Sequence, residues 1–202
     1  MAYHLMAKAA GIEMTECRLL EENGRSHFMT RRFDRESGND RIHVQSFCAM
    51  QHFDFNDVNS FSYEQLFETM RLLSLPYPQA EQLFRRMVFN VIARNCDDHS
   101  KNFAFLMDKT GKWSLSPAYD VCHSYRPGSP WVSGQSLSVN GKRENINSDD
   151  FLMVARQMNI KKAEVIVRQI NSEVQNWKHF AKETGVSGDL TEAIQKTLIK
   201  LD

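Results

Sequence analysis

The segment from Gln79 to Asn95 constrains the fold more than any other part of this chain. Leu83, Met87 and Val91 recur along it at intervals of four residues. Three more apolar residues accompany them, namely Phe84, Val88 and Ile92. A broad apolar face at this spacing is typical of an amphipathic helix that other elements cover. We therefore expect a core helix here, with the remaining elements packed around it.

Further segments show helical spacing or a capping residue. They are residues 1–11 with Gly11 as the stop, 62–73 with Ser62 as the cap, 149–158 with Ser148 as the cap, 161–184 and 189–201. Pro76 and Pro78 prevent the helix of residues 62–73 from continuing. Residues 42–50 are mixed in character, and the second half of this stretch is predicted to be helical.

Two β-hairpins are predicted, the first around the turn pair Asn23-Gly24, which is the strongest short hairpin signal. The hairpins join residues 17–22 to 25–33 and residues 103–107 to 112–115. Prolines and glycines make residues 117–141 irregular. The expected fold class is mostly α (α+β), with two short β-hairpins.

Charge and cysteine usage exclude several classes of protein. The 25 Lys and Arg residues balance the 25 Asp and Glu residues, which argues against a direct nucleic-acid binder or a membrane-surface binder. No stretch approaches the roughly 20 apolar residues of a membrane span, and the N-terminus does not resemble a signal peptide. The four cysteines form no CxxC pair and the seven histidines form no metal-ligand cluster. We expect reduced thiols and a cytoplasmic protein.

A dense polar segment, residues 94–103, follows the core helix. Asp97 and Asn102 are five residues apart in it, and Asp120 follows Asn102 by eighteen residues, beyond the second hairpin. Catalytic loops of protein-kinase-like enzymes have this order of Asp, four residues, Asn, a hairpin and another Asp. The first Asp accepts the proton of the attacking hydroxyl, whereas the Asn and the later Asp offer oxygen atoms to Mg²⁺.

Each of these acidic residues also has a simpler interpretation. Asp97 and Asp98 could be solvated loop acids, and Asp120 could be a residue that forms an Asx turn. The hairpin between Asn102 and Asp120 favours the chemical interpretation, because its two ends bring these side chains near one another.

Two runs carry a resemblance to a known family: Asn95-Cys-Asp-Asp-His-Ser-Lys-Asn-Phe103 and Ser116-Pro-Ala-Tyr-Asp-Val121. They resemble the C-terminal domain of the HipA family, the serine/threonine kinases of bacterial toxin–antitoxin modules. Arg32-Phe-Asp-Arg35 is similar to the hinge segment of that family. Residues 43–48 and 138–142 also resemble segments of the family. The resemblance implies a protein-kinase-like large lobe without the N-terminal small lobe.

This resemblance covers residues 1–202 and implies an internal division. Residues 1–60 would form a hinge and nucleotide-edge region, and residues 61–202 a helical lobe. The lobe would carry the catalytic loop at residues 94–103 and the metal-binding segment at residues 116–121.

The resemblance also implies roles for single residues. Asp97 would be the catalytic base, and Asn102 and Asp120 would hold Mg²⁺. His99 and Lys101 would belong to the catalytic loop, with Lys101 near the transferred phosphate. A structural histidine is as plausible for His99 as a direct role, and Lys101 could be a solvated lysine.

The nucleotide site follows from the same resemblance. The backbone from Arg31 through Arg32 to Phe33 would line the adenine pocket of ATP, and Gln45 would assist in binding the nucleotide. The side chains of Arg31, Arg32 and Arg35 are expected to form ion pairs around Asp34 rather than to bind phosphate.

The function that the resemblance implies is transfer of the ATP γ-phosphate to a protein hydroxyl. The substrate could be an aminoacyl-tRNA synthetase, and the partners a DNA-binding antitoxin or a separately encoded small lobe. The chain departs from full-length members because it has neither their phosphate-covering loop nor their ATP-binding lysine, so it is expected to be incomplete without a small lobe. The alternative is an inactive remnant that only binds the antitoxin.

Overall fold

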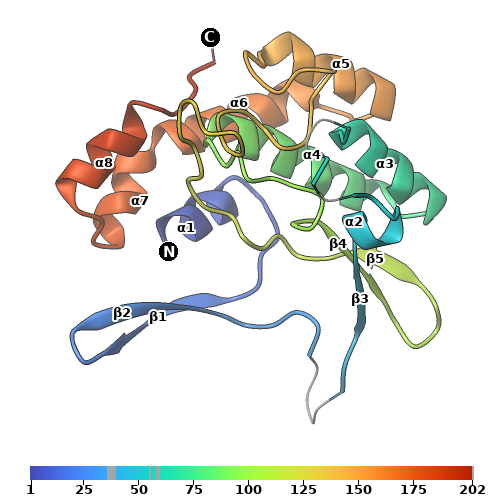
Figure 1. Cartoon of the computed structure of the whole chain (residues 1–202), viewed down its shortest axis with the longest axis horizontal. Helices are drawn as coiled ribbons and strands as arrows, with labels where there is room; N and C mark the ends of the chain where they lie inside the picture. The colour runs from blue at the N-terminus through green and yellow to red at the C-terminus, as the bar shows by residue number, and fades with distance from the viewer. Residues whose placement is uncertain (36–39, 55, 58–59, 202) are drawn as a thin grey trace.

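The computed structural model describes residues 1–35, 40–54, 56–57 and 60–201. Its helices are α1 (Ala2–Ala9), α2 (Phe47–Met50), α3 (Tyr63–Leu72), α4 (Tyr77–Ile92), α5 (Ser148–Met158), α6 (Ala163–Gln175), α7 (Trp177–Glu183) and α8 (Gly188–Gln195). Its strands are β1 (Cys17–Glu22), β2 (Arg25–Thr30), β3 (His43–Ser46), β4 (Ala104–Met107) and β5 (Trp113–Leu115). Figure 1 shows the helices gathered above the two small sheets. The expected α-rich fold class is confirmed.

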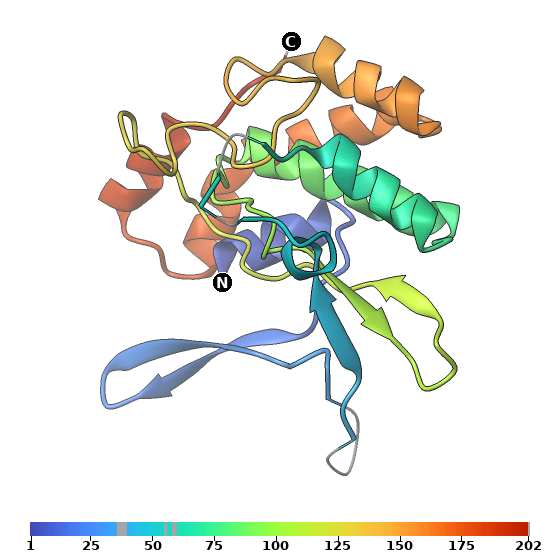
Figure 2. The same ribbon diagram turned by 45° about the vertical axis from the view of Figure 1, so that its right-hand side comes forward.

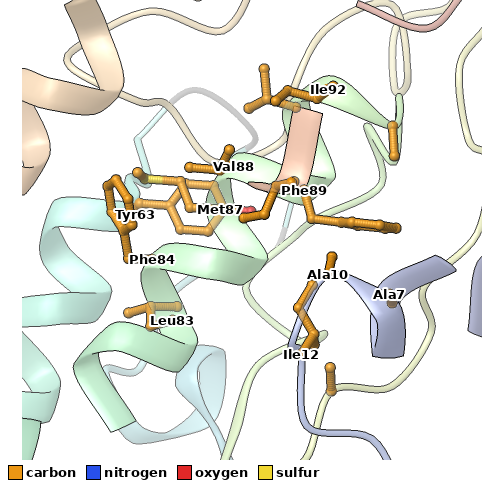
Figure 3. Close-up of a cluster of buried hydrophobic side chains, with 14 of the residues drawn as sticks. Ala7, Ala10, Ile12, Tyr63, Leu83, Phe84, Met87, Val88, Phe89 and Ile92 are labelled. Carbon is orange, nitrogen blue, oxygen red and sulfur yellow. The ribbon is translucent and has the colours of Figure 1, made fainter. Parts of the chain in front are cut away.

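Helix α4 is the core helix that the sequence predicts. It packs against α6 and α3, and its apolar side chains from Leu83 to Ile92 are buried. Figure 3 shows Tyr63 beside Met87 and Phe84 on one side of α4, whereas Ala7, Ala10 and Ile12 lie on the other side. Full burial of such apolar side chains contributes about 1.5–3 kcal/mol each. Because this packing surrounds the helix, α4 is a rigid base for the loop that follows it.

The ends of α4 differ from the prediction. The helix begins at Tyr77 rather than Gln79, because Pro76 is its N-cap and Pro78 lies in the first turn, where a helix needs no backbone N–H. It ends at Ile92 rather than Asn95, since Arg94 has a left-handed backbone with φ of 57° that turns the chain.

The N-terminal helix and the first hairpin follow the prediction. Gly11 ends α1 with φ of +77°, and its N–H donates to the carbonyl of Lys8. Asn23 and Gly24 both have positive φ, which matches the twist of a two-residue hairpin turn between β1 and β2. The strand β2 ends at Thr30, so the hinge residues that follow it are not in a strand. In Figure 1 the hairpin lies below α1, α7 and α8.

The second hairpin belongs to a larger sheet than the sequence predicts. Strands β4 and β5 pair as expected, and β3 adds to the other edge of β4 in antiparallel register, with Gln45 opposite Phe105. The strand β3 is short and not strictly alternating, which is why its pattern gave no strand prediction. Figure 2 shows this sheet beneath α2, whose helical conformation in residues 47–50 the sequence predicts.

The C-terminal helices correct three predictions. Asn147, not Ser148, caps α5, and its capping box with Asp150 satisfies the first N–H groups. The single helix expected over residues 161–184 is two helices that part at Asn176, because Trp177 packs against Tyr3 of α1. Helix α8 ends at Gln195 instead of residue 201, since the chain then runs back to α4, where the N–H of Ile199 donates to the carbonyl of Ile92.

Two further expectations are settled by this fold. Ser62 caps α3 in a capping box with Gln65, as predicted. Residues 117–141 contain turns and isolated bridges and form no helix or extended strand.

Among the helices of the described residues, none has the length and apolar character to cross a membrane.

Candidate active site

The loop between α4 and β4 folds on its own hydrogen bonds. The N–H of Asn95 donates to the carbonyl of Asn90 in the last turn of α4, and the N–H of Asn102 donates to the carbonyl of His99. The side-chain amide nitrogen of Asn102 donates to the carbonyl of Asp97 over 2.8 Å. These bonds bring the first Asp and the Asn of the predicted pattern together at one end of the loop.

Asp97 lies at the surface of this loop, with its side chain about half exposed. The Nε2 atom of His99 is 3.8 Å from its Oδ1 atom, which is an ion pair only when the imidazole is protonated. The His99 side chain is less exposed than the Asp97 carboxylate, at 24% against 46%. This placement suits a histidine that supports Asp97.

Asp98 is buried, and the interpretation of it as a solvated loop acid is wrong. Its Oδ2 atom accepts hydrogen bonds from the Tyr63 hydroxyl at 2.6 Å and from Gln135 Nε2 at 3.0 Å, and its Oδ1 accepts from the N–H of Ser136 at 2.7 Å. Burial raises the pKa of Asp98 to about 6, although the hydrogen bonds, that of Tyr63 first, act in the opposite direction. The carboxylate therefore anchors the catalytic loop to two distant segments.

Asp120 projects from a segment that is held at several points. The N–H of Ala118 donates to the carbonyl of Glu13, and the hydroxyl of Tyr119 donates to the carbonyl of Lys101 over 2.7 Å. Asp120 itself is exposed and has φ of 53°, a left-handed conformation that Asp tolerates better than most residues. Among the described residues, no hydrogen bond to its carboxylate is found.

Asn102 and Asp120 line the same small cavity, together with Asp98. The two predicted metal ligands thus border one cavity although a hairpin separates them in the chain. Lys101 is exposed on the same loop, and its carbonyl is the acceptor for Tyr119. Within the described residues, His, Cys, Asp and Glu form no group of three or more that could hold a metal ion.

The hinge residues lie along a separate hollow. Arg31, Arg32 and Phe33 line an open depression of about 700 Å³, whose other wall includes Met14 and Ile42. The ring of Phe33 contacts that of Tyr119, with 5.4 Å between centroids, so the hinge borders the segment of Asp120. Gln45 is on β3 and is not among the residues that line this hollow, so the structure does not bring it to the hinge.

The arginines of the hinge behave mostly as predicted. Arg32 makes a bidentate contact with the Asp34 carboxylate, at 2.8 and 2.7 Å, and Arg35 also pairs with Asp34. The hydrogen bond from Arg32 lowers the pKa of Asp34. Arg31 instead has its backbone N–H bonded to the carbonyl of Glu16, and no ion pair of it with Asp34 is found among the described residues.

These features define a class of protein. A buried helix leads into a loop with an exposed Asp and an inward Asn, and a hairpin then leads to a second exposed Asp beside that Asn. This is the arrangement of the large lobe of a kinase-like fold. Comparison with known proteins identifies the family: residues 1–178 match the HipA-like C-terminal domain. The chain belongs to this family, which confirms the resemblance seen in the sequence.

Three known proteins are similar over most of this chain. The curated protein named "Putative kinase Y4mE" of Sinorhizobium fredii is 25% identical over 190 residues. HipA of Shewanella oneidensis MR-1, solved with HipB and operator DNA, aligns with 96% of the chain at a TM-score of 0.73 and 15% identity. The Helicobacter pylori proinflammatory kinase CtkA also aligns with 96% of it, at a TM-score of 0.52 and 12% identity.

The chain spans only part of the length of each of these three proteins. The alignment with Y4mE includes 90% of this chain but only 39% of the length of Y4mE. The structural alignments include 52% of the HipA chain and 80% of the CtkA chain. The fold of this chain is the HipA-like, kinase-related fold.

Proposed function

We propose that this chain is the catalytic lobe of a HipA-like serine/threonine protein kinase, which transfers the γ-phosphate of ATP to a protein hydroxyl. The observation that carries the proposal is the meeting of Asn102 and Asp120 at one cavity, with Asp97 at the outer end of the same loop. Three oxygen-bearing side chains in this order are what phosphoryl transfer requires of the protein.

The residues at the site fit a magnesium ion. The amide nitrogen of Asn102 is engaged by the Asp97 carbonyl, which leaves its oxygen as the atom that can coordinate. The exposed Asp120 carboxylate supplies a second oxygen ligand. Mg²⁺ prefers such hard oxygen ligands and usually completes its shell with water and phosphate oxygens. When bound, it would neutralise charge on the phosphates.

Asp97 is the proposed general base. Its exposed carboxylate can accept the proton of an incoming hydroxyl, and the neighbouring His99 holds it in place. Lys101, exposed on the same loop, is proposed to lie near the transferred phosphate. ATP is proposed to place its adenine in the hollow along Arg31, Arg32 and Phe33. The role of Gln45, which lies outside that hollow, stays a prediction.

The partners are proposed from the relatives. Because HipA of Shewanella oneidensis is found in a complex with HipB and DNA, we propose an antitoxin as a partner of this chain. A small lobe, either joined to this chain or encoded separately, would complete the nucleotide site, which fits the share of its relatives that this chain spans. The aminoacyl-tRNA synthetase substrate, the cytoplasmic location and the division near residue 60 stay predictions.

Nucleotide binding tests the proposal directly. Titration of the chain with ATP and Mg²⁺, alone and with a small lobe supplied, is expected to show binding, and Asp120→Ala to weaken it by about tenfold or more. Asp189→Ala, on the exposed surface of α8, is the matched control and is expected to bind as the parent chain does. Equal binding by Asp120→Ala would reject the metal assignment. Absence of binding under both conditions would favour the inactive, antitoxin-binding alternative.

Phosphoryl transfer tests the base. With a small lobe present, Asp97→Ala is expected to abolish transfer to the protein substrate while nucleotide affinity stays within about twofold of the parent value. Transfer at an undiminished rate by Asp97→Ala would reject this role for Asp97.

A further inference from the structure

A small buried cavity lies directly beneath the candidate site. Its polar lining comes from α4, through Arg86 and Asn90, and from the catalytic loop, through Asn95, Asp98 and Asn102. Asp120, which is exposed, also lines the cavity. The cavity volume is about 10 Å³, which is close to the least volume that accommodates one water molecule. A phosphate group or any larger ligand is excluded by this size.

A chain of hydrogen bonds runs along one wall of the cavity. Asn95 Nδ2 donates to Asn90 Oδ1 at 3.0 Å, and Asn90 Nδ2 donates to the Tyr63 hydroxyl at 3.0 Å. The Tyr63 hydroxyl in turn donates to Asp98. Asn95 Oδ1 takes no part in this series of hydrogen bonds. It is buried and has no hydrogen-bond partner among the described residues. An acceptor is therefore unsatisfied at this wall.

Arg86 provides an unsatisfied donor on the helix side. The residue is only 4% exposed, and one of its terminal nitrogens donates to the carbonyl of Ser116 over 2.6 Å. Its Nε atom is buried with no hydrogen-bond partner in the described part of the chain. Burial lowers the pKa of Arg86 to about 10, so near neutral pH the guanidinium keeps its charge and Nε keeps its hydrogen.

We propose that one ordered water molecule occupies this cavity, accepts a hydrogen bond from Arg86 Nε and donates one to Asn95 Oδ1. Water is the ligand that combines an acceptor and a donor within this volume. Inside the cavity a cation is disfavoured beside the Arg86 guanidinium, so the proposed Mg²⁺ would lie outside it, at the exposed Asp120 carboxylate. An anion is disfavoured beside the Asp98 carboxylate and the Asn95 oxygen.

The water joins three parts of the site. Arg86 already holds the carbonyl of Ser116, four residues before Asp120, and the water extends this contact to the loop that carries Asn102. Arg86 is thereby a positioning residue for the Asp120 segment. Its importance for Mg²⁺ rests on the proposed function, whereas the water site itself does not.

A crystal structure of the full chain, at a resolution where ordered water is visible, tests the site without any need for activity. The expected result is one density peak about 2.7–3.2 Å from both Arg86 Nε and Asn95 Oδ1. Either an unfilled cavity or a direct contact between these two side chains would overturn the proposal.

Hydrogen exchange tests the positioning role. The N–H groups of Ser116 and Ala118 donate to the carbonyls of Ala104 and Glu13, so their exchange reports on the Asp120 segment. Arg86→Met is expected to speed their exchange by about tenfold or more relative to amides in the rest of the protein. Arg85→Met is the control on the same helix, because Arg85 instead contacts Glu81 and Gln169.

Equal exchange at Ser116 and Ala118 in the Met variants of Arg85 and Arg86 would reject the positioning role.

If Arg86→Met does not fold, Arg86→Lys replaces it. Lysine can keep the contact with Ser116 but has no N–H at the position of Arg86 Nε, so its crystal structure is expected to lose or shift the water peak. An unchanged peak in Arg86→Lys would overturn the assignment of Nε as the donor. Failure of Mg²⁺ binding in the parent chain would count against the proposed function alone.

Discussion

Asp97 and Asp98 are neighbours in the chain with opposite surroundings. The Asp97 carboxylate is about half exposed, whereas Asp98 is 1% exposed and accepts hydrogen bonds from three partners. A charged group is buried at this cost only where its hydrogen bonds compensate. Asp98 therefore holds the shape of the loop, while Asp97 is left available for chemistry.

Substitution of the two acids separates these roles. Asp98→Ala leaves the Tyr63 hydroxyl, the Gln135 amide and the Ser136 N–H without their acceptor, so we expect it to lower the free energy of unfolding by about 3 kcal/mol. Asp97→Ala is expected to change it by less than about 1 kcal/mol. Urea unfolding of both variants measures the difference. Equal losses would contradict the anchoring role of Asp98.

The raised pKa of Asp98 gives stability a pH dependence. The folded carboxyl keeps its proton up to about pH 6, whereas an unfolded Asp loses it near its ordinary value of 3.8. Between these values the folded state binds more protons, so the free energy of unfolding falls as the pH rises. Relative to Asp98→Asn, the parent chain is expected to lose stability from about pH 4 to pH 6 and then to level off. Unfolding of both proteins across this range checks the sign.

At this scale the sequence predicted the pattern of the site but not its support. Asp97, Asn102 and Asp120 could be proposed as site residues because their spacing is local and the hairpin between Asn102 and Asp120 has a clear sequence signal. The burial of Asp98 could not be predicted, because Tyr63 and Gln135 lie 35 and 37 residues away from it in the chain. Such contacts depend on tertiary packing, which no local pattern contains.

At the scale of elements, the helix caps show how far local signals reach. Both Asn147 and Ser148 are good capping residues, and Asp150 is the third residue after Asn147. Since the reciprocal bonds of a capping box need that spacing of three, the pair Asn147 and Asp150 fixes the start of α5. At α3 the same rule selects Ser62 with Gln65, and there the prediction was right.

The corrected cap is directly testable. Asn147→Ala is expected to lower the free energy of unfolding by about 1 kcal/mol, because it removes the acceptor for the N–H of Asp150. Ser148→Ala, one residue into the helix, is expected to cost less than about 0.5 kcal/mol. Thermal unfolding of the two variants distinguishes them. A larger loss for Ser148→Ala would restore the original assignment.

The break between α6 and α7 belongs to the same scale. Helical spacing continues through residue 176, so the sequence predicted a single helix. The structure turns the chain there because Trp177 must reach Tyr3, with 5.5 Å between ring centroids, and its indole N–H must reach the carbonyl of Thr191. Because Tyr3 is at the other end of the chain, no local sequence pattern could predict that α6 and α7 part at Asn176.

At the scale of the whole molecule, Trp177 joins the first helix to the last. It is 1% exposed, and it packs between α1 and α8. Trp177→Ala is expected to lower the free energy of unfolding by about 3–5 kcal/mol, as large-to-small core substitutions do. Trp131→Ala removes the same side chain from an irregular segment where it is 59% exposed, and is expected to have little effect. Denaturant unfolding, followed by circular dichroism, compares the two, and a minor loss for Trp177→Ala would mean that the two ends fold independently.

The hairpin of β1 and β2 has a consequence for handling the chain. Apolar side chains are exposed on it, including Leu20 and Phe28, and the sheet to which it belongs has two strands among the described residues. The outer edges of such a ribbon present N–H and C=O groups to which a strand of another copy can add. We therefore predict that, in concentrated solution, copies of the chain associate first through the edges of this hairpin.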